Sequence, residues 1–307
     1  MPKVAVILVN FRRGAETVEC IRSLGRSSYE DFDVIVVDNG SADGSLQMLR
    51  REYPDTHLIE SQRNLGFAEG NNLGIRHALQ HSFEYILLLN NDTTVEETML
   101  ESLVKTVQEN PQAAIVGAKI YYFDRPRALW FAGGRFNICT AKPTHIGLNE
   151  IDVGQYDHFG PCDYVTGCCL FARREVYERI GLLDPSYFAY FEDADFCIRA
   201  RRVGFGVYYQ PCSIVYHKVS STSALDSSTY IYFTLRNKIL FLRKNSRLWH
   251  WFPCLPFLVY FYGRHFVRLI IKWRDFPRAR AAWFGLVDGL RDFTGEHGEG
   301  RLYQLQP

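Results

Sequence analysis

Short apolar runs alternate with helix-spaced segments along the first 120 residues. The apolar runs predict strands at residues 4–9, 33–37, 57–60, 85–89 and 114–117. Apolar positions three and four residues apart predict helices at residues 15–24, 45–52, 68–79 and 96–109. Continuous apolar strands that alternate with helices are typical of a mostly parallel sheet covered on both faces. The pattern therefore predicts an α/β fold.

The rest of the chain is less regular. Glycine and proline residues mark loops between residues 120 and 215. The elements predicted there are a strand at 164–172, helices at 174–180 and 194–203, and a strand at 214–216. We expect a sheet domain at residues 1–225, followed by a helical segment at residues 226–307.

Polar side chains follow each of the first four predicted strands. They are Asn10, Asp38, Arg63 with Asn64, and Asn91 with Asp92. Ligands of open α/β sheets bind at the carboxyl ends of the strands. We therefore expect these side chains to share one site, in which Asp38 accepts hydrogen bonds from a nucleobase or ribose. The alternative for Asp38 is a turn that precedes a helix cap.

The loop after the third strand is dense in glycine and asparagine. Residues 64–74 hold three of each, among them Asn64, Gly66 and Asn71. Glycine allows close approach of the backbone to a ligand, asparagine can bind polar ligand edges, and Arg63 can neutralise a phosphate. The alternative is a glycine-rich loop that only caps the next helix.

Two acidic segments are candidates for metal binding and catalysis. Asp92, flanked by amide side chains, suits Mg²⁺ or Mn²⁺ shared with substrate phosphates; the alternative is an ordinary helix cap. Glu192, Asp193 and Asp195 crowd three carboxylates into four residues, which raises at least one pKa and suits a general base. The alternative is an acidic helix start, in which Asp195 pairs with Arg199.

His217 stands at the end of the last predicted strand. A return strand at this position brings His217 to the same edge of the sheet, where it contacts a metal or a phosphate. A structural histidine is the equal alternative.

Together these motifs resemble glycosyltransferase family 2 with the GT-A fold, and most of all its bacterial rhamnosyltransferase-like branch. The segments that carry the resemblance are residues 36–45, 63–74, 88–93, 167–174 and 191–195, with His217 and residues 232–243 extending it. The resemblance covers about residues 3–245. It implies a Rossmann-like nucleotide-sugar-binding sheet domain at residues 1–225.

The resemblance also implies roles for single residues. Asp38 and Asn10 correspond to nucleotide-binding positions, and Asp193 or Glu192 to the catalytic base. Asp92 matches the last acid of the family's Asp-x-Asp metal motif, although Asn90 replaces the first acid. His217 matches a histidine that completes the metal or diphosphate site. Arg236 and Asn237 resemble a motif for which the sequence gives no role.

The implied reaction is an inverting transfer of a sugar from a nucleotide-diphosphate donor. The expected donor is a dTDP- or UDP-sugar, with rhamnose as the sugar, and the expected acceptor is a hydroxyl of a glycan or a lipid-linked acceptor in cell-surface polysaccharide synthesis. The expected cofactor is Mg²⁺ or Mn²⁺. The alternatives are a non-catalytic nucleotide-sugar-binding or scaffold protein and a sugar nucleotidyltransferase.

Charge is uneven along the chain although the net charge is only +1. Residues 236–280 hold eleven Lys or Arg residues against one acid, Asp275, among many aromatic residues. This composition predicts a segment that lies on an anionic membrane surface. A packed helical lid or a homodimer contact is the alternative.

The remaining features concern partners and location. The small net charge gives no indication of nucleic-acid binding. The eight cysteines, in no Cys-x-x-Cys pattern, predict reduced thiols. We expect no secretory signal and no spanning helix. The expected location is the cytoplasm, with peripheral attachment to the inner face of the cell membrane.

Overall fold

A computed structural model describes most of the chain. The described residues are 1–138, 140–219, 227–246, 256, 259–260, 262–264, 266–272 and 274–294. Its amino-terminal elements are β1 (Val4–Asn10), α1 (Gly14–Leu24), β2 (Phe32–Asn39), α2 (Ser45–Glu52), β3 (His57–Ser61), α3 (Gly66–Gln80) and β4 (Tyr85–Asn90). The predicted strands and helices of this part are confirmed to within a few residues.

The central and carboxyl-terminal elements are more varied. The strands are β5 (Thr93–Val95), β6 (Ala113–Tyr122), β7 (Leu129–Phe131), β8 (Gly134–Asn137), β9 (Lys142–His145), β10 (Gly160–Pro161), β11 (Cys169–Arg173) and β12 (Gly206–His217). The helices are α4 (Met99–Glu109), α5 (Arg174–Ile180), η1 (Pro185–Tyr187), α6 (Glu192–Arg202), α7 (Ser228–Asn245), η4 (Arg268–Lys272) and α9 (Phe276–Arg291).

One large mixed sheet organises the molecule, in the order β10-β12-β6-β11-β4-β1-β2-β3. Strands β1 to β4 run parallel, β11 is antiparallel to both β4 and β6, and β12 is parallel to β6. The apolar strands are buried because helices cover both faces. The predicted α/β fold with a mixed sheet is confirmed.

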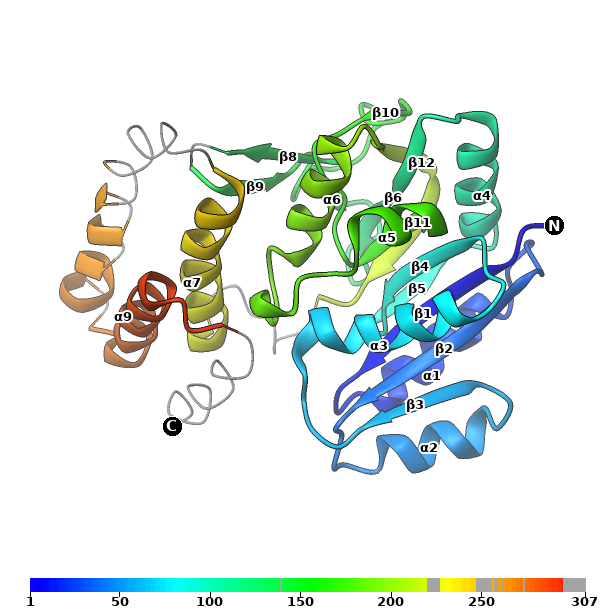
Figure 1. Cartoon of the computed structure of the whole chain (residues 1–307), viewed down its shortest axis with the longest axis horizontal. Helices are drawn as coiled ribbons and strands as arrows, with labels where there is room; N and C mark the ends of the chain where they lie inside the picture. The colour runs from blue at the N-terminus through cyan, green and yellow to red at the C-terminus, as the bar shows by residue number, and fades with distance from the viewer. Residues whose placement is uncertain are drawn as a thin grey trace.

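Helices reach the sheet closely where small residues permit it. A side chain at Gly74 would begin 2.6 Å from Ile7, and one at Gly70 would begin 3.1 Å from Val9. These glycines let α3 pack directly on β1. Figure 1 shows α3 crossing in front of these strands and α1 behind them.

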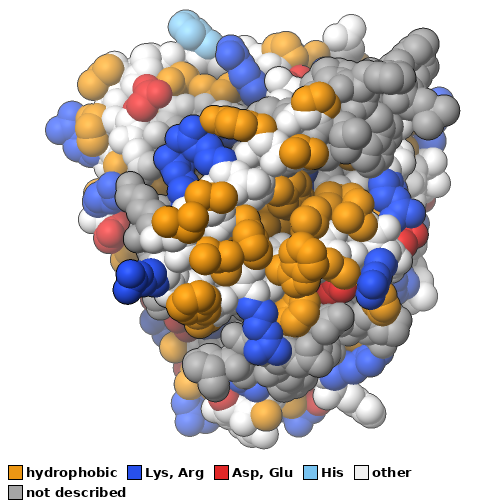
Figure 2. All heavy atoms as spheres, turned by 90° about the vertical axis from the view of Figure 1, so that its left-hand side faces the viewer, with side chains coloured by type: hydrophobic (Ala, Val, Ile, Leu, Met, Phe, Trp, Pro, Cys, Tyr) orange, Lys and Arg blue, Asp and Glu red, His pale blue; other side chains and the backbone are white. Residues whose placement is uncertain are grey.

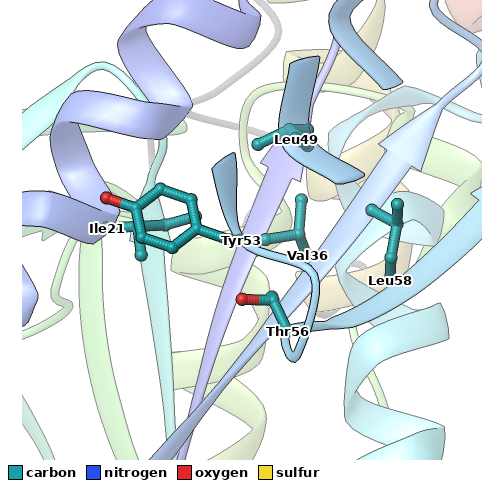
Figure 3. A pocket seen from close by; sticks show the side chains of 6 residues that line it. All are labelled: Ile21, Val36, Leu49, Tyr53, Thr56 and Leu58. Atoms are coloured by element: carbon teal, nitrogen blue, oxygen red, sulfur yellow. The ribbon is translucent and has the colours of Figure 1, made fainter. Parts of the chain in front are cut away.

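Helices α1 and α2 pack on the opposite face of β2. Between them lies a small pocket lined by Ile21, Val36, Leu49, Tyr53, Thr56 and Leu58 (Figure 3). No carboxylate, histidine or basic side chain lines this pocket. It is therefore part of the packing between these helices and the sheet rather than a candidate for chemistry.

The carboxyl-terminal helices form the left-hand end of the molecule in Figure 1. Helix α9 crosses α7 at close range, since a side chain at Gly285 would begin 2.6 Å from the carbonyl oxygen of Tyr232. Tyr262 donates a hydrogen bond of 2.7 Å to the carbonyl oxygen of Leu235. Helix α7 is thus covered by the segment that follows it, while the division of the chain at residue 225 stays a prediction.

Several predicted boundaries are wrong. The strand predicted at 214–216 is only the end of β12, which begins at Gly206, and the strand predicted at 114–117 continues to Tyr122 as β6. Three further boundaries differ for identifiable reasons. The strand predicted at 164–172 begins only at Cys169, because the N–H of Gly167 donates to Asp193 instead of to a neighbouring strand. The helix predicted from 194 begins at Glu192. The helix predicted from 96 begins at Met99, directly after β5 and a turn.

Candidate active site

Asn10 and Asp38 form the floor of the site at the ends of β1 and β2. Asp38 is 2% exposed, and its Oδ1 accepts a hydrogen bond of 2.7 Å from Asn10 Nδ2. Its Oδ2 accepts the backbone N–H of Ser41 at 3.1 Å. Thr17 donates to Asn10 Oδ1 and accepts from Asn91 Nδ2, both at 2.9 Å. Through Thr17, one hydrogen-bond network therefore connects three predicted nucleotide-binding residues, Asn10, Asp38 and Asn91, the last of which directly precedes Asp92.

A second network shapes the loop before α3. Asn64 Oδ1 accepts the N–H of Gly66 at 2.9 Å and Asn39 Nδ2 at 3.1 Å. Arg63 is exposed at the mouth of this loop. Asn71, in contrast, is buried and donates at 2.8 Å to the carbonyl oxygen of Phe67 in its own helix. The amide of Asn71 is thus engaged within α3, and its predicted ligand contact stays a prediction.

Asp92 and His217 lie side by side although 125 positions separate them. Strand β5 pairs with β12 so that Thr93 is opposite His217, which brings the histidine against the carboxylate. His217 Nε2 lies 3.1 Å from Asp92 Oδ1, and both residues are buried. Because residues 93–95 form a strand, the helix-cap alternative for Asp92 is wrong.

The charge on Asp92 is favoured by its neighbours. Burial alone raises the pKa of this carboxyl, but the contact with His217 and the positive charge of Arg13 outweigh burial and lower it overall. Arg13 Nη1 lies 3.9 Å from Asp92 Oδ2. Sequence reasoning missed Arg13, although it follows the first strand and directly precedes α1, and anions commonly bind at helix amino termini.

A divalent cation fits this pair only if it is shared with a ligand. Within the described residues, no group of three His, Cys, Asp or Glu side chains is arranged to hold a metal. Asp92 and His217 supply one carboxylate and one imidazole, and His217 Nδ1 is buried with no hydrogen-bond partner in the described part of the chain. Such a set matches ions that take most of their ligands from phosphate and water.

Glu192 and Asp193 begin α6 in different surroundings. Glu192 is 4% exposed, and burial, followed by the charge of Asp193, raises its pKa well above the usual range. Asp193 is half-buried; burial raises its pKa as well, against the opposing effect of N–H donors from Gly167 at 2.9 Å and Ala194 at 2.7 Å. Two carboxyl groups that resist ionisation therefore lie at the helix start.

Asp195 is separate from this pair and has a structural role. Its Oδ2 accepts from Arg199 Nε at 2.7 Å, and its Oδ1 accepts from Tyr187 and Asn245. The predicted ion pair between Asp195 and Arg199 is confirmed. Asp195 thus connects two turns of α6 through Arg199, and it connects α6 to α7 through Asn245.

The segment that directly precedes β11 links the two acidic centres through its backbone, since the N–H of Gly167 donates to Asp193 Oδ2 at 2.9 Å. Burial raises the pKa of the Cys168 thiol well above its usual range, and the negative charges of Asp92 and Asp193 act in the same direction. The carbonyl oxygen of Cys168 also accepts the N–H of Asn90 at 2.9 Å. The segment before β11 therefore contacts both Asp193 and the end of β4, two residues before Asp92.

Aromatic residues that sequence reasoning missed surround this centre. The ring of Trp130 meets His217 edge-on at 4.7 Å and His145 at 4.5 Å. Tyr164 is buried near Asp193, and its hydroxyl has no hydrogen-bond partner among the described residues. Their positions depend on β7 and the β8–β9 hairpin, which the sequence pattern did not reveal.

The comparisons with known proteins agree with this geometry. Residues 5–181 match Glycosyl transferase family 2, and the chain belongs to this family. The low-salt glycan biosynthesis hexosyltransferase Agl10 of Haloferax volcanii is 27% identical, over 95% of this chain and 92% of its own. The N-acetylglucosaminyl-diphospho-decaprenol L-rhamnosyltransferase of Mycobacterium tuberculosis is 23% identical, over 76% of this chain and 84% of its own.

A solved structure extends the likeness of fold to the whole chain. The mannosyltransferase PcManGT from Pyrobaculum calidifontis, in complex with GDP-Man and Mn²⁺, has a TM-score of 0.58 at 16% identity and covers 99% of this chain and 79% of its own. The fold is thus the GT-A fold, and relatives named as a hexosyltransferase and as a rhamnosyltransferase support the expected rhamnosyltransferase-like branch of family 2. The scaffold and nucleotidyltransferase alternatives are not favoured.

Proposed function

We propose that this glycosyltransferase moves a sugar from a nucleotide-diphosphate sugar to an acceptor hydroxyl with inversion at the anomeric carbon. The observation that carries the proposal is that the segment before β11 contacts two unlike acidic centres: the N–H of Gly167 donates to Asp193, and the carbonyl oxygen of Cys168 accepts from Asn90, two residues before Asp92. One holds an ionised carboxylate beside a histidine, and the other holds carboxyls whose pKa is raised. The first suits a diphosphate leaving group with a metal, and the second suits a general base.

Asp193 is proposed as the base and Glu192 as the alternative. Asp193 is partly exposed, whereas Glu192 is buried and cannot reach an acceptor without a rearrangement. The Asp193 carboxylate takes the proton of the acceptor hydroxyl while the oxygen bonds to the anomeric carbon. The bond from that carbon to the diphosphate breaks on the opposite face, so one displacement inverts the configuration. A general base of this kind accelerates a reaction about 10²–10⁴-fold.

The donor end is assigned to the floor of the site. Asn10 and Asp38 bind the nucleoside, and the loop with Arg63, Asn64 and Gly66 lies beside it. Asp92 and His217 would hold Mg²⁺ or Mn²⁺, and the bound ion would supply charge neutralisation for the diphosphate. The names of the relatives support rhamnose or another hexose as the sugar, and one relative is named a dTDP-rhamnosyl transferase, which supports a dTDP-sugar; a UDP-sugar is the alternative.

The acceptor is proposed to be a glycan or a lipid-linked sugar, presented where the carboxyl-terminal end rests on an anionic membrane. Apolar side chains there are more than half exposed: Val259, Tyr260, Val267, Ile271, Phe276 and Trp283. Exposed arginines accompany them, at Arg264, Arg268, Arg274 and Arg280. Figure 2 shows this end, with apolar side chains gathered in the centre and Lys and Arg side chains around them.

The described part of the segment divides between the two interpretations of its aromatics. Tyr262 and Phe266 pack against the apolar cluster of α7 and α9, as the packed-helix alternative expects. Trp249, Trp251, Phe252, Phe257, Phe261 and Trp273 lie outside the described residues. None of the helices in the described ranges is long and apolar enough to cross a bilayer. Peripheral attachment and a homodimer stay predictions.

A nucleotide-release screen tests the proposed function. Nucleotide sugars of the dTDP, UDP and GDP classes are incubated with extracts of lipid-linked and soluble glycans, with Mn²⁺, with Mg²⁺ or with EDTA. We expect release from one class, lost with EDTA and in Asp92→Asn, while Asp43→Asn, an exposed carboxylate, stays active. Transfer that is equal with EDTA and in Asp92→Asn would remove the metal role, and no release from any donor would contradict the function.

A further inference from the structure

The turn at residues 186–191, directly before Glu192, has a backbone conformation that bulky residues rarely adopt. Phe188, Tyr190 and Phe191 have φ angles of 64°, 70° and 78°. Each residue in the left-handed region costs on the order of 1 kcal/mol or more, so the conformation persists only where other contacts enforce it. The catalytic carboxylates follow this turn without a spacer, so its shape decides where they lie.

Asn237 of α7 binds the backbone of this turn through hydrogen bonds. It is fully buried, and its amide nitrogen donates to the carbonyl oxygens of Tyr187 at 3.0 Å, Ala189 at 2.7 Å and Tyr190 at 2.8 Å. Its Oδ1 accepts from Arg236 Nε at 2.9 Å, which fixes the orientation of the amide. Since the amide has two hydrogens, one of them is shared between two of these oxygens, and one side chain thus contacts three carbonyl groups within four consecutive residues.

Arg236 adds hydrogen bonds to the same turn, although burial removes its charged guanidinium from water. Its guanidinium is fully buried over the ring of Phe233, and burial lowers its pKa. Nη2 donates to the carbonyl oxygens of Ser186 at 3.0 Å and Tyr187 at 2.6 Å. The Tyr232 hydroxyl and the negative charge of Asp288 act against burial and favour the cation. A buried cation bound mainly to backbone carbonyls is expensive, so its position indicates a specific demand for order in the turn.

The same turn also holds the donor side of the site. The carbonyl oxygen of Phe188 accepts the N–H groups of Phe67 at 2.7 Å and Ala68 at 3.1 Å, in the first turn of α3. Gly66 packs so closely that a side chain there would begin 2.5 Å from that oxygen. The turn is therefore a single rigid link between the loop before α3 and the carboxylates of α6.

We propose that Asn237, oriented by Arg236, is a positioning residue that sets the catalytic base and couples it to the donor loop. It acts through the 186–191 turn and does not touch the substrate. This inference rests on the proposed function, since the base is assigned there. It gives the Arg236-Asn237 motif a role that the sequence alone left open.

The test compares Asn237→Ala with Arg173→Ala in the full chain. Arg173 also grips three backbone carbonyls, those of Val107, Asn110 and Ala113, but it does so beside α4. We expect kcat of Asn237→Ala to fall about 10–100-fold, as small misplacements of reacting groups do, with the acidic limb of the pH profile displaced and the Kd for the nucleotide diphosphate unchanged. Arg173→Ala should lose stability while its kcat and pH profile stay those of the wild type.

Hydrogen exchange supplies a readout that needs no activity. The amides of Phe67 and Ala68 should exchange faster in Asn237→Ala and stay protected in Arg173→Ala. If Asn237→Ala does not fold, Asn237→Ser, which retains one donor, takes its place. A variant with normal kcat, normal pH profile and protected amides would overturn the inference. A wild type without transferase activity would instead contradict the proposed function, while the exchange measurement would still decide on the grip.

Discussion

Neighbouring carboxyl groups at the start of α6 differ in what surrounds them. Glu192 Oε2 is buried without a hydrogen-bond partner in the described part of the chain, whereas Asp193 binds two backbone N–H groups and remains partly exposed. Both pKa values are raised, chiefly by burial. Only Asp193 combines a raised pKa with access to an acceptor.

Replacing the base should therefore separate binding from chemistry. Asp193→Asn is expected to lose about 10²–10⁴ in kcat, the usual contribution of a general base, while calorimetry shows unchanged affinity for a nucleoside diphosphate. In the wild type, kcat should fall as pH falls through the raised pKa, because the base must be ionised. Glu192→Gln is the matched variant: if it loses kcat and Asp193→Asn does not, the roles are reversed.

His145 predicts a pH dependence of stability. Burial lowers its pKa from the usual 6.5 to about 4. The folded state thus holds it neutral, and its contribution is present above pH 6.5 and is lost as pH falls toward 4. Between pH 8 and pH 5 the linked loss is about 2 kcal/mol of unfolding free energy.

Urea unfolding at several pH values measures this loss. Between pH 8 and pH 5 the wild type should lose more unfolding free energy than His145→Gln, which lacks the titrating imidazole. His158→Gln, an exposed histidine, is the control. Parallel pH curves for the wild type and His145→Gln would contradict the assignment.

Residue types at strand ends could be predicted from the sequence, but their partners could not. Asn10 and Asp38 were expected in one site because both follow strands, and a hydrogen bond joins them. Asn71 was expected beside a ligand, yet its amide caps a carbonyl of its own helix. An asparagine amide can bind either the backbone or a ligand, and only the fold distinguishes the two.

At the scale of elements, the start of α3 depends on Gly66. Its φ of 80° is accessible mainly to glycine, and a side chain would collide with Phe188. Gly66→Ala is expected to destabilise the protein by about 1–3 kcal/mol and to raise the KM for the donor, because the loop before α3 moves. Denaturant unfolding and steady-state kinetics measure both effects.

Gly181→Ala is the matched control for Gly66→Ala. Gly181 has the same φ of 80°, but nothing lies near its missing side chain. We expect it to lose stability through strain alone and to keep its donor KM. Equal donor KM values in the two variants would show that Gly66 has no role in the site.

Strand pairing explains which elements the sequence concealed. Strand β5 has only three residues and lies within a segment that resembles a helix cap, yet its pairing with β12 places His217 beside Asp92. Apolar runs indicated β1, β2 and β4 because those strands are buried on both faces. Short edge strands with mixed polarity, such as β8 and β9, carry no comparable pattern.

At the scale of the whole molecule, the carboxyl-terminal end predicts binding to anionic vesicles. Wild type should float with phosphatidylglycerol vesicles and not with phosphatidylcholine, and added salt should weaken the binding. The double variant Ile271→Ser with Trp283→Ser should bind less, since both side chains are more than half exposed. Val153→Ser, equally exposed but outside this end, is the control.

Point variants are preferable to a deletion of the chain after α7. Such a deletion would remove Tyr262 and Leu269 from the apolar cluster that covers α7. A wild type that fails to float at low salt would contradict membrane attachment. A wild type that floats equally with both lipids would contradict the charge contribution. In the first case a soluble glycan becomes the expected acceptor.

The central claim is a single displacement at the anomeric carbon, assisted by Asp193 as the general base. The anomeric configuration of the first product tests it. With the donor found by the release screen, NMR of the glycoside formed at early times compares its anomeric configuration with that of the donor. A general base at Asp193, with the diphosphate bound at the Asp92–His217 pair, predicts a product of inverted configuration, formed about 10²–10⁴-fold more slowly by Asp193→Asn. A product that keeps the configuration of the donor would contradict the account.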